Sequence, residues 1–512
     1  MPKTLNIAVI GAGTMAQAVH LPVLRRRWDR FTIAALVDHS PRRRRESSEV
    51  WGIEEDKRYE SVADLIAAVR AKTLSLDAAL LSTDGLHVED LLALMRRGIP
   101  VLVEPPIGYS AEEVAKVADF ERMTGRRLLM MAYPQQYDDS VTRMAEQIAT
   151  KDLRMVDHEV LMPASQPLFG AAHVTTSSYD LPTEVRSQRR KALQAAVEAG
   201  AGGGATQRDR DLYVKGLLTG VAHQLAVLEA SYGPLTQLTA VRHWPKGVIP
   251  GSLELMGELA GGARVRLVWH YLPFAPEYSE TVQILSARRK MRVELPAPSH
   301  GDSRSTVALR EKKSGVVQET ATTAPKGAAE LMWEAFHAFV EKGKEPVSGA
   351  AEARDQVILL REVLSSIVEA DGRSLDAEDD AEDDAGESES AEAAAVTEAT
   401  EAAESTGAAE SAESSESAAD AEDIESAAGP AAIESTESTA DTAASADDTA
   451  PTTDPAPATD AAENAESEPP AEPAAEPAGP AEPAPAGTAG EEPVDAWSTG
   501  AAQDPAEDPT RP

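Results

Sequence analysis

Short apolar runs alternate with amphipathic segments over residues 1–130. The apolar runs predict strands, and the segments between them predict helices with one apolar face. We expect strands at 5–10, 31–37, 78–81, 99–103 and 128–132, and helices at 14–26, from Ser40-Pro41 onward, at 88–97 and at 110–123. Strands and helices alternating at this spacing predict a parallel sheet with helices on both faces. This part of the chain is therefore expected to be an α/β domain.

The pattern changes after residue 135. Leu212–Ser231 is predicted to be an apolar helix, and it contains His223. Strand alternation follows at 253–259, 263–271, 281–286 and 290–295, and apolar stripes predict helices around 331–339 and 350–368. Residues 163–210 are less regular, with glycines at 200–204, and predict an excursion or a loop. We expect an α+β domain with an open antiparallel sheet at 131–375.

Residues 376–512 differ in composition from the rest of the chain. They hold 39 Asp and Glu residues and one basic residue, Arg511, so they account for the whole net charge of −38 and leave residues 1–375 formally neutral. Such a segment has too little apolar surface to offset chain entropy. We expect a disordered acidic tail that keeps the protein in solution. The alternatives are contact with a basic partner and contact with the chain's own Arg42–Arg45.

Composition also excludes several classes of function. The chain has no cysteine, so disulfides and thiolate sites are excluded. Its ten histidines show no paired metal-ligand spacing on one helix. Neither a signal peptide nor an apolar run near the ~20 residues of a transmembrane helix is visible. The neutral core and the acidic tail disfavour nucleic acid. We expect a cytoplasmic protein that binds a small molecule, without a metal or a membrane contact.

A glycine-rich turn follows the first strand. Gly11-x-Gly13-x-x-Ala16 allows a tight bend, close approach of the backbone to a pyrophosphate, and close packing of helix on strand. Asp38 closes the second strand, where an acid accepts hydrogen bonds from the ribose hydroxyls of NAD. Together these features predict a Rossmann domain that binds a nicotinamide dinucleotide. Asp38 favours NAD; the basic run Arg42–Arg45 leaves NADP as the alternative, unless that run is a solvated helix face.

The chain resembles the glucose-fructose oxidoreductase / inositol dehydrogenase / MocA (Gfo/Idh/MocA) family over residues 5–375. The resemblance rests on Ile7–Gly13, Asp77–Thr83 with His87, Val101–Glu104 and a late segment around Phe339–Gly349. It implies NAD(P)-dependent oxidation or reduction of sugars, inositols and related polyols, and a homo-oligomer formed through the sheet of the second domain. With the glycine turn, it places the expected cofactor contacts at Gly11, Gly13, Thr14, Met15, Ala16, Asp38, Thr83, His87 and Glu104.

Two motifs of that family are incomplete in this chain. The family carries Glu-Lys-Pro after the fourth strand, with the lysine acting in proton transfer, whereas this chain has Glu104-Pro105-Pro106. Proline has no titratable group. The family also carries an Asp, a His four residues later and a second Asp three residues after that, and these positions here read Thr219, His223 and Ala226. The remaining catalytic candidates are His223, Glu104 and Tyr133.

Each candidate also has a structural interpretation. His223 is either a general acid or a core histidine with one hydrogen bond. Glu104 is either a cleft residue or a group that caps backbone or forms a salt bridge, and Tyr133 has no neighbouring lysine in the sequence to lower its pKa. Two hypotheses follow: an NAD-dependent oxidoreductase acting on a sugar, polyol or related hydroxyl or carbonyl compound, or a non-catalytic cofactor-binding sensor or scaffold on the same fold.

Overall fold

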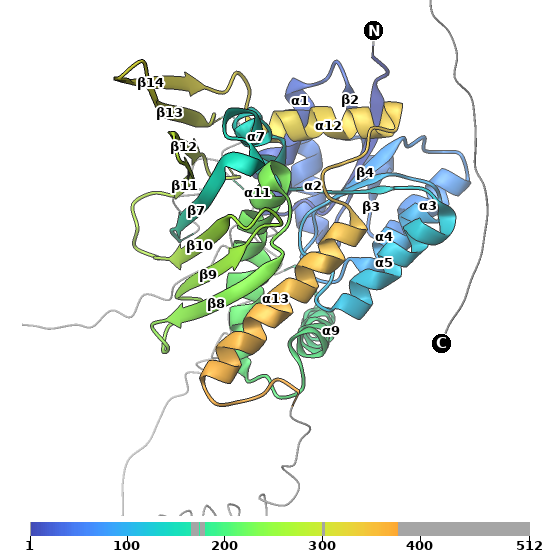
Figure 1. Cartoon of the computed structure of the whole chain (residues 1–512). Helices are drawn as coiled ribbons and strands as arrows, with labels where there is room; N and C mark the ends of the chain where they lie inside the picture. The colour runs from blue at the N-terminus through green and yellow to red at the C-terminus, as the bar shows by residue number, and fades with distance from the viewer. Residues whose placement is uncertain (1, 165–173, 175–179, 300–302, 377–512) are drawn as a thin grey trace, which may run out of the picture. The chain divides into compact units, whose positions relative to one another are not determined.

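The computed structural model describes residues 2–164, 174, 180–299 and 303–376. All of them belong to one compact unit that spans Met1–Ser438, and Figure 1 draws its helices and strands. The acidic tail predicted for 376–512 lies outside the described residues, apart from Asp376. Within the irregular stretch expected at 163–210, residues 165–173 and 175–179 also lie outside the described residues.

The first sheet is parallel throughout, as the apolar runs predict. In spatial order its described strands are β3 (Arg58–Tyr59), β2 (Phe31–Val37), β1 (Leu5–Ile10), β4 (Ala78–Leu81), β5 (Val101–Val103) and β6 (Leu129–Met131). β4 is buried along its whole length, as expected for a strand covered on both faces. The strand order reverses between β1 and β4, and ligands bind at this switch point in such sheets. The Rossmann fold is confirmed, and β3 is a short edge strand that was not predicted.

The helices of this half mostly follow the prediction. They are α1 (Leu21–Arg26), α2 (Pro41–Trp51), α3 (Val62–Arg70), α4 (Val88–Met95) and α5 (Ala111–Thr124), with a 3₁₀ turn η2 (Glu55–Lys57). Ser40 caps α2 by accepting the N–H of Arg43. The helix expected at 14–26 differs, because Ala16–His20 forms a π-helical turn, η1, before α1. A π turn therefore lies directly after the glycine-rich bend.

The second sheet is mixed rather than purely antiparallel. In spatial order its described strands are β14 (Val316–Thr323), β13 (Thr306–Lys313), β12 (Arg289–Leu295), β11 (Ser279–Ser286), β7 (Leu153–Met162), β10 (Arg264–Tyr271), β9 (Ser252–Glu258) and β8 (Gln237–Trp244). β7 and β10 pair in parallel, and the other neighbours are antiparallel. The predicted α+β class is confirmed with that difference. β14 is exposed at every position, so alternation could not predict it.

Helices of the later chain pack on both sheets. They are η3 (Pro134–Tyr137), α6 (Asp139–Thr142), α7 (Met144–Gln147), η4 (Thr150–Asp152), α9 (Thr183–Ala201), α10 (Gln207–Leu212), η6 (Tyr213–Val221, π-helical), α11 (Ala222–Tyr232), α12 (Ala328–Lys342) and α13 (Ala350–Ala370). In Figure 1, α13 runs along α5, and the two helices are in contact. The α12 residue Trp333 is completely buried against Phe31 of β2.

α9 is the helix that the sequence pattern missed, and the expectation of irregular chain is wrong for Thr183–Ala201. Most of its residues are good helix formers, but its buried stripe is limited to Val197, Gly200 and Ala201. A Cβ atom at Gly200 would lie 1.9 Å from the carbonyl oxygen of Tyr109, which precedes α5. The hydroxyl group of Tyr213 donates to the same oxygen at 2.8 Å. The end of α9 thus rests directly on backbone of the first half.

Gly200→Ala should lower the free energy of unfolding by about 1–3 kcal/mol, although alanine is the better helix former, because its methyl group would overlap the Tyr109 carbonyl. Urea denaturation followed by circular dichroism measures this change. Gly203→Ala is the matched control, since no described atom lies within 4 Å of its Cβ position. Equal denaturation midpoints for the two variants would refute the close contact.

Candidate functional site

The bend after β1 is set by the backbone of the neighbouring strand. Gly11 has a φ of +89°, and a Cβ atom there would lie 2.2 Å from the carbonyl oxygen of Ser82, just after β4. Only glycine fits this position. A Cβ atom at Gly13 would be 3.9 Å from the same oxygen, so packing within the protein does not require glycine there. The open position at Gly13, beside a helix start, fits a pyrophosphate.

Asp38 links this bend to the end of β2. Its Oδ2 accepts the N–H of Ala12 at 2.8 Å, and its Oδ1 accepts the N–H of Ser40 at 2.8 Å. The residue is 7% exposed, and Oδ2 lies 3.9 Å from Nη1 of Arg43. A carboxylate fixed at this point suits ribose hydroxyls, which donate hydrogen bonds, and repels a phosphate.

The basic run after Asp38 is not a uniform surface. Arg42 and Arg45 are exposed, and Arg44 donates to the carbonyl oxygen of Asp38. Arg43 is 7% exposed and lines the pocket at the end of the sheet. The interpretation of the run as a solvated helix face is therefore right for Arg42 and Arg45 and wrong for Arg43.

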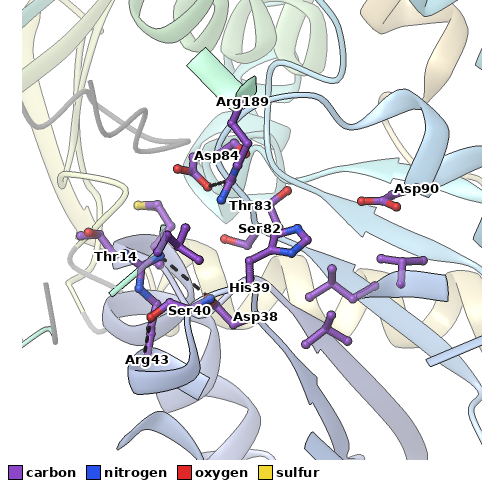
Figure 2. Close-up of a pocket in the computed structure, with 17 residues that line it drawn as sticks. Thr14, Asp38, His39, Ser40, Arg43, Ser82, Thr83, Asp84, Asp90 and Arg189 are labelled. Carbon is purple, nitrogen blue, oxygen red and sulfur yellow. Dashed lines mark hydrogen bonds and ion pairs between the residues drawn. The ribbon is translucent and has the colours of Figure 1, made fainter. Parts of the chain in front are cut away.

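The pocket lies at the switch point of the sheet. Figure 2 shows Asp38, Ser40 and Arg43 close together, with Asp84 and Arg189 facing each other elsewhere in the pocket. Arg189 belongs to α9 and donates to Oδ1 of Asp84 at 2.9 Å. Six expected cofactor contacts line the pocket: Gly11, Gly13, Thr14, Met15, Asp38 and Thr83. Sequence reasoning missed His39, Ser82, Asp84, Asp90, Leu181 and Arg189, which also line it.

The other expected contacts, Ala16, His87 and Glu104, are not among the residues that line this pocket. Ala16 is fully buried at the start of η1. Nε2 of His87 donates to the carbonyl oxygen of Thr83 at 2.8 Å, and burial lowers the pKa of His87, so its ring is neutral at pH 7. His87 therefore holds a residue of the pocket wall.

Glu104 lies in a buried chain of polar groups. Its Oε1 is 2.5 Å from Nε2 of His20, and Nδ1 of His20 accepts the indole N–H of Trp333 at 3.1 Å. Because Nδ1 accepts, the proton of a neutral His20 is on Nε2 and is donated to Glu104. Glu104 is 1% exposed, and its Oε2 has no hydrogen-bond partner among the described residues. Burial raises the pKa of Glu104, and the hydrogen bond from His20 opposes that shift.

The other two catalytic candidates contact each other. The rings of Tyr133 and His223 lie edge to face, with centroids 5.1 Å apart. The Tyr133 hydroxyl donates to Oε1 of Gln356 at 2.6 Å. Burial raises the pKa of Tyr133, with smaller contributions from the charge of Glu229 and, last, from that of Glu104. The structure thus brings the three candidates into one region. None of the three is among the residues that line the pocket in Figure 2.

His223 is half-buried as a residue, yet both of its ring nitrogens are inaccessible and lack a hydrogen-bond partner among the described residues. Burial lowers the pKa of His223 to about 4, and the charge of Glu280 opposes that shift. Glu280 is itself the centre of a buried cluster that sequence reasoning missed. It accepts hydrogen bonds from His158 at 2.9 Å and from the Tyr278 hydroxyl at 2.7 Å. No sequence spacing signals this cluster, because pairing of β7 with β11 brings its members together.

Two further properties concern the described part of the chain. No group of three or more His, Cys, Asp or Glu residues in it could hold a metal ion. Its helices are all too short or too polar to cross a membrane.

A switch-point pocket with a glycine bend, a helix start and a buried acid at the end of β2 is typical of a dinucleotide-binding Rossmann protein. Residues 5–133 match the model of the Gfo/Idh/MocA oxidoreductase family, described as an NAD-binding Rossmann fold. Residues 5–133 thus form a domain of the Gfo/Idh/MocA type.

One curated relative shows how far the sequence similarity extends. The inositol 2-dehydrogenase of Arthrobacter sp. (strain FB24) is 30% identical over 173 residues, which are 33% of this chain and 49% of that protein. The chain thus spans about half the length of this curated relative.

Solved structures support the fold over a longer stretch. A UDP-N-acetylglucosamine 3-dehydrogenase from Acidithiobacillus ferrooxidans has a TM-score of 0.51 at 14% identity, covering 71% of this chain and 98% of its own. A 3-ketoreductase from Actinomadura kijaniata in complex with NADP has a TM-score of 0.50 at 14% identity, covering 71% and 98%. At this identity the likeness concerns the fold alone. The comparisons establish an NAD(P)-binding fold and do not distinguish NAD from NADP.

The raised pKa of Glu104 gives a pH-dependent prediction. Since the folded-state pKa is raised, an ionised Glu104 costs native stability, and that cost grows as pH rises from the ordinary glutamate range through the raised value. Glu104→Gln has no such titration. The free energy of unfolding of the variant minus that of the wild type should therefore increase as the pH rises from 4.5 to 8.

Urea denaturation at several pH values measures this difference. Glu89→Gln, at an exposed position of α4, is the control for the loss of a carboxylate that is not buried. A flat profile for Glu104→Gln would mean that Glu104 ionises in the folded protein as easily as in the unfolded chain.

Proposed function

We propose that this chain is an oxidoreductase that binds NAD in the pocket between β1 and β4 and acts on a sugar, polyol or related hydroxyl or carbonyl compound. The observation that carries the proposal is the pair formed by the open Cβ position at Gly13 and the Asp38 carboxylate, which is bound to the N–H of Ala12. The inositol 2-dehydrogenase that is similar to 173 residues of this chain supports a polyol as the substrate class.

Each part of the cofactor has a matching group in this pocket. The backbone around Gly11 and Gly13 and the start of the following helix would hold the pyrophosphate. Asp38 would accept hydrogen bonds from the ribose, and it disfavours a 2′-phosphate, which is why we propose NAD rather than NADP. Thr83, whose carbonyl oxygen accepts a hydrogen bond from His87, would form another part of the pocket wall against the cofactor. When bound, the nicotinamide ring supplies the hydride acceptor or donor.

Proton transfer is the step that this chain's own side chains must provide. His223, with a pKa of about 4, is uncharged at neutral pH. A neutral imidazole can accept a proton from a substrate hydroxyl, and we propose His223 as a general base in the oxidising direction, a weak one at neutral pH because its pKa is about 4. Tyr133 stays protonated because its pKa is raised, chiefly by burial, and Glu104 adds to that shift when it is ionised.

The second candidate function is cofactor binding without catalysis. It is favoured by Pro105 at the position of the family's lysine and by the sealed positions of Glu104 and both His223 nitrogens. Loss of a positioned acid or base costs about 10²–10⁴ in rate, so a weak enzyme is compatible with the same residues.

We also propose a role for each of the three parts of the chain. Residues 1–130 would bind the cofactor, and residues 131–375 would bind the substrate and join identical subunits through the second sheet. The acidic tail 376–512 would keep the protein in solution, with contact to a basic partner as the alternative. These assignments stay predictions.

Gly13→Ala should weaken NADH binding by about tenfold or more, since the added methyl group would stand where the backbone meets the pyrophosphate. The melting temperature should change little, because the Cβ position is open in the protein. Titration calorimetry measures the affinity, and Gly247→Ala, another open position, is the control. Wild-type affinity in Gly13→Ala would place the dinucleotide elsewhere.

Turnover separates the two candidate functions. The wild type should produce NADH from NAD with myo-inositol or another member of a polyol and sugar panel, followed by absorbance at about 340 nm. His223→Ala should lower kcat by about 10²–10⁴ while the affinity for NADH stays the same. Tight NADH binding without turnover on the whole panel would support the non-catalytic alternative.

A further inference from the structure

An acidic side chain from the segment just before α9 lies at the start of α2. Both carboxylate oxygens of Asp180 accept the hydroxyl hydrogen of Ser40, at 2.9 and 2.8 Å, and Oδ2 also accepts the N–H of Arg42 at 2.8 Å. Burial opposes ionisation of Asp180, but these hydrogen bonds and the charge of Arg43 outweigh it, so the pKa of Asp180 lies below its ordinary value. The Ser40 hydroxyl and the N–H of Arg42, at the start of α2, are therefore already bound to a carboxylate of the same chain.

The Asp180 carboxylate lies next to Asp38, the acid that is proposed to face the ribose. Ser40 donates its N–H to Asp38 and its hydroxyl to Asp180, so the two carboxylates bind the same residue. The next residue after Asp180, Leu181, lines the dinucleotide pocket itself. Asp180 thus lies at the ribose end of that pocket.

A 2′-phosphate on the adenine ribose needs donors and positive charge at this same place. Hydroxyl groups, the N–H groups at a helix start and an arginine are the groups that bind phosphate in such sites. Here Ser40, the N–H of Arg42 and the neighbouring Arg43 form that set. Asp180 accepts from two of these groups and adds a negative charge beside them.

The segment that carries Asp180 is held against the first half of the chain at several points. Arg189 of α9 pairs with Asp84 at 2.9 Å, and Gly200 at the other end of α9 rests on the Tyr109 carbonyl. These contacts position the start of α9, three residues beyond Asp180, over the pocket.

We propose that Asp180 is a specificity-determining residue that takes the place of the 2′-phosphate and makes the pocket reject NADP. The inference rests on the proposed function, since it assigns a role at the same cofactor site. It differs from the role of Asp38, because Asp38 binds the ribose hydroxyls that NAD presents, whereas Asp180 only has to block the phosphate that NAD lacks.

The test compares affinities for NADH and NADPH by titration calorimetry on the full chain. Asp180→Ala removes the charge and releases the two donors, and Asp180→Asn removes the charge but keeps an acceptor. Glu184→Gln is the matched control, because it removes one charge from an exposed position four residues along the same segment. We expect NADPH affinity to rise about tenfold in Asp180→Ala and less in Asp180→Asn, with NADH affinity and the Glu184→Gln control unchanged.

The salt dependence gives a second criterion. Asp180 is an exposed residue, so the gain from removing its charge should shrink in about 1 M salt, where exposed charges are screened within about 3 Å. A gain of the same size for NADH and NADPH would make Asp180 a general obstruction and overturn the proposal. The proposal would also be overturned if Asp180→Ala had the same ratio of NADPH affinity to NADH affinity as Glu184→Gln. If wild type and all variants bind neither nucleotide, the proposed function itself fails.

Discussion

The close contact between Gly11 and the carbonyl group of Ser82 is the constraint on which the N-terminal half depends. The strands β1 and β4 are neighbours, and the chain leaves β1 by crossing the end of β4 with no room for a side chain. The positive φ of Gly11 turns the backbone so that the N–H of Ala12 reaches Asp38. A larger residue would push the two strands apart at the point where the helix must begin. The conformation of Gly11 thus sets the turn, the point where the helix begins and the hydrogen bond between Ala12 and Asp38.

The charges around the pocket are balanced locally. Arg43 lies near Asp38, and Arg189 is paired with Asp84, so each arginine of the lining has a carboxylate beside it. A dinucleotide pyrophosphate would consequently be held by backbone N–H groups and a helix start rather than by arginine side chains. This arrangement makes the ribose end sensitive to single charges, because Arg43, the arginine of the lining at that end, already lies beside Asp38. The position of Asp180 at that end matters for this reason.

The parts of the fold that sequence predicts are those governed by local rules. The strands β1, β2 and β4, the Ser40 cap and the role of Gly11 follow from apolar runs, capping and turn chemistry. The missed elements have no such signal. β14 is wholly exposed, α9 has a weak apolar stripe, and the π-helical turns η1 and η6 depend on tertiary packing. The pocket residues Leu181 and Arg189 could not be predicted either, because they reach the first sheet only through the docking of α9.

The surroundings of His223 bear on whether chemistry survives in this chain. The structural interpretation of a core histidine predicted one hydrogen bond, yet neither ring nitrogen has a partner among the described residues. Burying an unsatisfied polar nitrogen costs about 1–3 kcal/mol, so an ordinary core position would be better filled by an apolar side chain. A substrate hydroxyl that reached His223 would supply the missing partner and relieve that cost. The same hydroxyl is the group whose proton must leave when a polyol is oxidised, so the two candidate functions differ in whether a substrate reaches the buried ring nitrogens of His223.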